Sequence, residues 1–157
     1  MAKEHFDLSG VSAETEAFWK GFQEHMGYTD EEIANFRSDP KRARLPEIMT
    51  SPKMRNSTMV VEVVESLACA EGMQPGDKLY FTGLAKLDPS RSSPWCAHAL
   101  MPAVLHANEC QTLVVNGIDA NEMYWPYQGC EDCGSKHSWG RLIMKTYVIE
   151  ENPEDKE

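Results

Sequence analysis

The sequence predicts an α+β fold, in which an N-terminal helical segment precedes a small, mostly antiparallel sheet with one central, kinked helix. Helical spacing and capping signals fill the first 55 residues, whereas runs of β-branched residues bounded by turn residues begin near residue 58. The only long helix expected among these strands contains a proline. We therefore expect one α+β domain over residues 1–150, made of a helical extension (1–55) and a cysteine-containing core (56–150), followed by a disordered acidic tail (151–157).

The helical extension is predicted from its apolar spacing and its caps. Ser12 is placed to cap a helix that runs to about Met26, because apolar residues recur three and four positions apart, at Phe18, Trp19, Phe22 and Met26. Gly27 is suited to end this helix. Thr29 and Glu32 form a capping box for a second helix, which stops before Pro40. Three prolines over residues 40–52 indicate a connector with one helical turn.

The core begins with two expected strands, at 58–65 and 78–82, which we expect to pair because the turn signal Pro75-Gly76-Asp77 separates them. A helix should follow from Trp95 to about Cys110, with Pro102 producing the kink. One face of this helix is predicted to carry Cys96, Leu100, Ala103, Ala107 and Cys110. A loop without periodicity follows Asn116-Gly117, and a closing strand is expected over residues 139–149.

Charge and composition limit the classes of function. The 157 residues carry a net charge of −10, which disfavours partners with phosphate backbones or anionic lipids, so we expect neither nucleic acid nor membrane binding. The N-terminus lacks the apolar stretch of a signal peptide, and the five cysteines are an odd number. These features favour a cytoplasmic protein whose cysteines are free thiols or metal ligands rather than a disulfide scaffold.

The strongest chemical signal is the spacing Cys130-x2-Cys133-x3-His137. Two intervening residues let a tight loop direct both sulfurs at one ion, and the flanking Gly129 and Gly134 permit the bends that this requires. Because a structural zinc site needs four ligands, the shell must be completed from upstream or by water. The upstream candidates are Cys69, Cys96 and His98. We expect zinc or iron here, in a structural or a catalytic role.

Two other classes of function fit the same residues. In a thiol oxidoreductase, Cys130 and Cys133 would form a reversible disulfide, although the negative charges of Glu131 and Asp132 between them oppose thiolate formation. In a metal-free accessory or binding subunit of a larger enzyme, an aromatic loop would contact a small-molecule ligand or a protein partner. Its residues would be Trp95, Tyr124, Trp125, Tyr127 and Trp139, for which simple packing around a loop is the plainer interpretation.

The core also resembles a family of small, uncharacterised bacterial and archaeal proteins that contain cysteine, over roughly residues 58–149. The resemblance is carried by Cys69-x2-Gly72-x3-Gly76-Asp77, by Trp95-Cys96-Ala97-x-Ala99-Leu100-x-Pro102, and by Gly129-Cys130 with Trp139-Gly140. It implies no reaction. It does imply that Cys69, Cys96 and Cys130 should be tested together.

Overall fold

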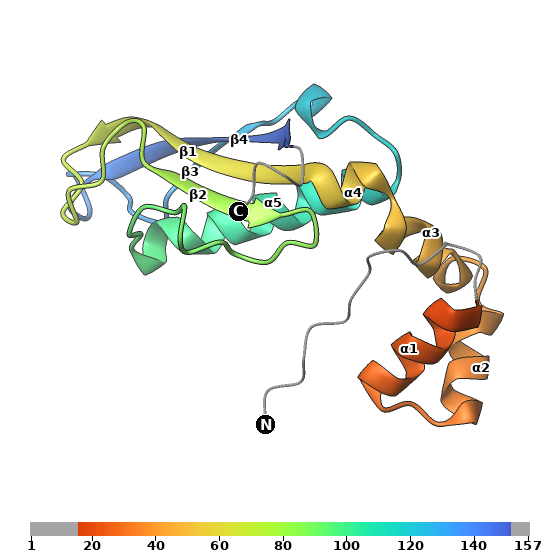
Figure 1. Ribbon diagram of the computed structural model, residues 1–157. Coiled ribbons are helices and arrows are strands. Elements are labelled where there is room, and N and C mark those ends of the chain that lie inside the picture. Colours follow the sequence, from red (N-terminus) through yellow and green to blue (C-terminus); the bar gives the residue numbers. More distant parts are fainter. Residues whose placement is uncertain (1–15, 152–157) are drawn as a thin grey trace. The chain divides into compact units, whose positions relative to one another are not determined.

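The computed structural model describes residues 16–151. The chain separates into two compact units, Met1–Arg55 and Asn56–Glu157. Each unit has its own elements (Figure 1). Helices alone form the described part of the first unit, and a four-stranded sheet with one long helix forms the second. The predicted α+β fold class is confirmed.

The first unit is built from α1 (Glu16–Met26), α2 (Asp30–Ser38), a 3₁₀ turn η1 (Arg42–Arg44) and α3 (Leu45–Thr50), and α4 (Pro52–Asn56) leads out of it. Its core consists of Phe18, Trp19 and Ile33. The predicted capping box is confirmed, since the Thr29 hydroxyl accepts from the Glu32 N–H and the Glu32 carboxylate accepts from the Thr29 N–H. The predicted cap at Ser12 lies outside the described residues.

Residues 40–52 are more helical than predicted. Pro46 lies in the first turn of α3, and Pro52 is the first residue of α4. A proline in the first turn of a helix loses no intrahelical hydrogen bond, since the N–H groups there have no partner within the helix. These prolines therefore lie at the starts of helices, and the prediction of a connector with one helical turn is wrong.

The sheet has the order β2–β1–β4–β3, and every neighbouring pair is antiparallel. Its strands are β1 (Ser57–Leu67), β2 (Lys78–Thr82), β3 (Tyr127–Gly129) and β4 (Arg141–Glu150). The expected pairing of the first two strands is confirmed, with Val60 opposite Tyr80. Strand β3 is not predicted from the sequence, because three residues are too few to show alternation.

Helix α5 (Ala97–Val115) packs against the sheet (Figure 1). Its buried side includes Ala99, Ala103, Ala107, Cys110 and Val114. Alanines at four-residue spacing let the helix backbone approach the buried strand side chains closely, among them Met59, Val61 and Met144. Pro102 lies inside the helix, and Cys96 is its N-cap residue. None of the helices in residues 16–151 is long and apolar enough to span a bilayer.

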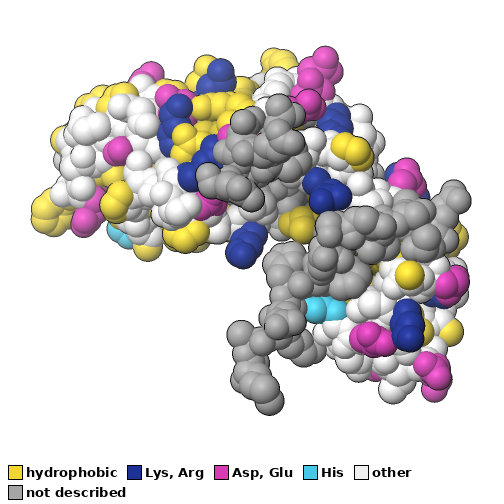
Figure 2. Space-filling view, viewed as in Figure 1, with side chains coloured by type: hydrophobic (Ala, Val, Ile, Leu, Met, Phe, Trp, Pro, Cys, Tyr) yellow, Lys and Arg dark blue, Asp and Glu magenta, His cyan; other side chains and the backbone are white. Residues whose placement is uncertain are grey.

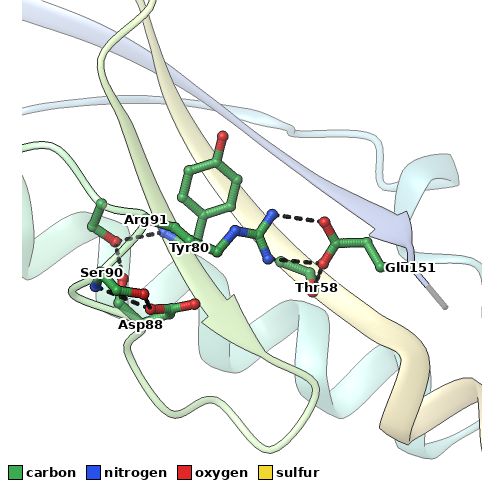
Figure 3. Close-up of polar contacts among 7 residues, drawn as sticks. Thr58, Tyr80, Asp88, Ser90, Arg91 and Glu151 are labelled. Carbon is green, nitrogen blue, oxygen red and sulfur yellow. Dashed lines mark hydrogen bonds and ion pairs between the residues drawn. The ribbon is translucent and has the colours of Figure 1, made fainter. Parts of the chain in front are cut away.

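Arg91 fastens the far end of β4 (Figure 3). Its guanidinium donates to both carboxylate oxygens of Glu151, at 2.9 and 2.6 Å, and lies 4.4 Å from the centre of the Tyr80 ring. Glu151 also accepts from the Thr58 hydroxyl on β1. Glu151 is thus held in place, and the rest of the predicted disordered tail lies outside the described residues.

Hydrophobic side chains bordered by Lys and Arg cover part of the molecular face in Figure 2.

Candidate functional site

A pocket of about 500 Å³ opens where β1 ends and β4 begins. This volume lies within the usual range for small-molecule sites. Three parts of the sequence that are distant from one another line it, with residues Cys69, Ala70, Glu71, Cys96, Ala97, His98, Cys130, Asp132, Trp139, Gly140, Arg141 and Leu142.

Four of the six predicted site residues share this pocket: Cys69, Cys96, His98 and Cys130. Cys69 follows the end of β1, Cys96 is the N-cap of α5, and Cys130 comes directly after β3. All three cysteines are free and partly buried. The fold therefore delivers one thiol from the end of each of three different elements to a common cavity.

The other two predicted site residues, Cys133 and His137, do not line the pocket. Both side chains are exposed. The Cys133 Sγ lies 3.9 Å from the Glu131 carbonyl oxygen, and the His137 N–H donates to the Gly134 carbonyl in a surface turn. Within residues 16–151, no three Cys, His, Asp or Glu side chains are grouped closely enough to hold a metal ion. The expected constellation of Cys130, Cys133 and His137 is therefore not gathered around this cavity.

Cys130 is held by backbone pairing beyond the end of β3. Its N–H donates to the Leu142 carbonyl at 3.2 Å, and its Sγ accepts from the Leu142 N–H at 3.2 Å. Leu142 belongs to the buried part of β4. The sulfur is thus fixed by a rigid strand, at the wall of the pocket.

Pro102 leaves a backbone carbonyl in the first turn of α5 free to bind the segment that follows Cys130. A proline inside a helix has no N–H to donate to the carbonyl four residues earlier, and its ring pushes that carbonyl outward. Here that carbonyl belongs to His98, and it accepts a hydrogen bond from the Glu131 N–H at 3.0 Å. The predicted kink residue therefore provides the acceptor that joins the first turn of α5 to the residue after Cys130.

Asp132 organises the loop that follows. Its Oδ1 accepts from the Gly134 and Trp139 N–H groups, both at 3.2 Å, and its Oδ2 accepts from the Gly140 N–H at 3.1 Å. These donors, the Gly140 N–H first, hold the pKa of Asp132 below its ordinary value. From the sequence alone, Asp132 is expected to act only as a negative charge. An aspartate two residues before a glycine is a common turn signal that could have identified this role.

Gly140 lets the loop close against β1. A Cβ on this residue would overlap the Ala68 carbonyl oxygen and would lie 2.5 Å from the Leu67 carbonyl oxygen. Ala68 itself adopts a left-handed conformation with φ of +50°. A non-glycine residue rarely adopts this conformation without surrounding support. The chain therefore turns sharply just before Cys69, at the point where the loop touches it.

The residues of the predicted aromatic loop are largely on the surface, and of these residues only Trp139 lines the pocket. The exposed fractions are 82% for Tyr124, 74% for Trp125, 58% for Tyr127 and 74% for Trp139. Tyr124 and Trp125 contact each other edge to face, with ring centres 4.7 Å apart. The interpretation of these four residues as packing around a loop is therefore wrong, whereas Trp95 is partly buried.

Comparison of the chain with protein-family models, with curated proteins and with solved structures found no match.

Proposed function

We propose that this protein binds a zinc or iron ion in the pocket, through Cys69, Cys96 and Cys130. One observation carries the proposal. Three of the five cysteines, each just beyond or at the start of a different element, line the same cavity. The remaining two do not: Cys110 is fully buried in the core, and Cys133 is exposed.

The donor set suits these metals. Thiolates and imidazoles are the preferred ligands of zinc in proteins, and iron also binds them. The imidazole of His98, in the first turn of α5, is the fourth ligand in this proposal. The sulfurs must move inward to reach zinc–sulfur distances of about 2.3 Å. Cys69 lies outside regular structure and Cys96 lies at a helix cap, so both can shift without breaking an element.

This ligand set differs from the one that the spacing of the last third predicted. Cys133 and His137 are left out because they do not line the pocket. Should a water take the place of His98, the ion would have the open coordination position of a catalytic metal centre. With His98 bound, the shell is closed and the role is structural.

The test is elemental analysis of protein purified without added metal. We expect about one zinc or iron per chain, and a loss of at least tenfold in affinity for added zinc in each of Cys69→Ser, Cys96→Ser and Cys130→Ser. Cys133→Ser is the matched control and should bind zinc as the wild type does. A wild-type protein that takes up neither metal, or equal losses in the control, would refute the proposal.

A second candidate function, a binding subunit, is favoured by the exposed aromatic residues. Tyr124 is the most exposed large apolar side chain among the described residues, and its neighbour Trp125 is as exposed as Trp139. Such residues are enriched where proteins bind one another. On this view the double variant Tyr124→Ser/Trp125→Ser loses a partner that co-purifies with the wild type, whereas Trp139→Ser keeps it. Equal recovery from both variants would remove this candidate.

A further inference from the structure

We infer that Asp132 is the positioning residue of the thiol pocket: its carboxylate closes the 130–140 loop against the end of β1, so that three thiol-bearing segments face one cavity. What the cavity binds rests on the proposed function. The positioning itself does not, and it can be tested without metal.

First, the Asp132 carboxylate reaches backbone N–H groups at both ends of the loop. Its three backbone donors, Gly134, Trp139 and Gly140, lie near the start and at the end of the loop. Residues 135–139 between these ends have exposed side chains. Both oxygens of Asp132 are used, one for Gly134 and Trp139 and the other for Gly140. A single side chain thus closes the loop upon itself.

The second step is the contact between the closed loop and β1. Gly140 is buried, and its missing Cβ leaves room for the Leu67 and Ala68 carbonyl groups. Cys69 follows directly. Because Asp132 holds the Gly140 N–H, it also holds the surface against which the backbone before Cys69 rests.

The third step is the start of the loop. Cys130 is paired with Leu142, and the Glu131 N–H is bonded to the His98 carbonyl, two residues after Cys96. Asp132 therefore directly follows two residues, Cys130 and Glu131, that are held by hydrogen bonds to β4 and α5. Through these contacts the closed loop joins the segments that carry Cys69, Cys96 and Cys130. The Asp132 carboxylate acts on the three cysteines only indirectly, because its backbone hydrogen bonds go to Gly134, Trp139 and Gly140.

The experiment measures alkylation of each cysteine in metal-free, reduced protein, by pulse labelling with iodoacetamide and mass spectrometry. Asp132→Asn keeps the shape of the side chain but leaves only one accepting oxygen. We expect Cys69 and Cys130 to be labelled at least fivefold faster than in the wild type, while Cys110 stays unlabelled and so reports an intact core. Glu131→Gln is the matched control, because it removes the same charge one residue away, and it should label as the wild type does.

Two results would overturn the inference: rates at Cys69 and Cys130 within twofold of the wild type in Asp132→Asn, or the same acceleration in Glu131→Gln. A second measurement needs no variant. In the wild type, hydrogen exchange should be slow at the Gly140 and Trp139 amides and fast at the amides of residues 135 and 136, and fast exchange at Gly140 would also refute the role.

Zinc titration of the same proteins separates the two proposals. A wild type that binds neither zinc nor ferrous iron refutes the metal site, and the labelling pattern still decides the role of Asp132. A wild type that binds zinc, with Asp132→Asn at least tenfold weaker and Glu131→Gln unchanged, supports both.

Discussion

Gly140→Ala is the sharpest steric test of how the pocket is built. A methyl group at this position would meet three backbone atoms of Leu67 and Ala68, including a carbonyl oxygen 2.5 Å away. Ordinary carbon–oxygen contacts need about 3.5 Å. The loop must therefore retreat from β1 by roughly 1 Å, because backbone atoms, unlike the end of a flexible side chain, cannot turn aside.

The expected loss in the free energy of unfolding follows from this displacement. Overpacking of this kind typically costs about 1–3 kcal/mol. Gly140 does not adopt a left-handed φ, so alanine brings no added conformational strain. Gly129→Ala is the matched control, since its Cβ would lie 3.8 Å from the nearest atom, the Leu142 carbonyl oxygen. There we expect no loss, or a gain below about 1 kcal/mol from the reduced freedom of the unfolded chain.

The assay is urea denaturation of both variants and the wild type in metal-free buffer, combined with cysteine labelling. Gly140→Ala should lower the free energy of unfolding and accelerate labelling of Cys69, and Gly129→Ala should do neither. Equal stability of the two variants would show that the loop does not rest against β1 as described.

Two further predictions concern Cys110 and Pro102. Burial, aided by the nearby Glu109 charge, raises the pKa of Cys110 from 9.0 to about 11. Between these values the unfolded chain loses the thiol proton while the folded protein keeps it. The free energy of unfolding is therefore unaffected by this thiol below about pH 9 and falls by about 2–3 kcal/mol as the pH rises toward 11. Urea denaturation should show this loss in the wild type and not in Cys110→Ala, and an equal loss in both would contradict it. Pro102→Ala restores an N–H that competes with the Glu131 N–H for the His98 carbonyl, so labelling of Cys130 should rise severalfold. The free energy of unfolding should change by less than about 1 kcal/mol, because relief of the proline penalty offsets the loss of the buried ring carbons. Unchanged labelling would contradict this.

Local features of the fold were predictable because their causes are local. The Thr29 and Glu32 capping box and the turn before β2 each involve residues a few positions apart, and both are confirmed. The predicted face of α5 is confirmed for Ala103, Ala107 and Cys110, whereas Leu100 is only partly buried and Cys96 is the N-cap residue. The short β3 was missed because its pairing with β4 depends on residues some 15 positions away, with Tyr127 opposite Lys145.

The site was predictable only in part, for the same reason. The interval between Cys130 and Cys133 suggests that their sulfurs converge, but it contains no information on which way the loop faces. That direction is set by Asp132, whose carboxylate bonds to the backbone as far as Gly140, and it leaves Cys133 on the surface. Cys69 and Cys96 reach the pocket through the pairing of whole strands and the packing of α5, which no short motif encodes.

X-ray absorption spectroscopy of the zinc-loaded protein tests the central claim most directly, because it counts the sulfur atoms bound to the metal. We expect three sulfurs at about 2.3 Å and one nitrogen or oxygen. The sulfur count should fall to two in Cys96→Ser and stay at three in Cys133→Ser. A wild-type spectrum with fewer than three sulfurs, or a sulfur lost in Cys133→Ser, would contradict a metal site formed by Cys69, Cys96 and Cys130.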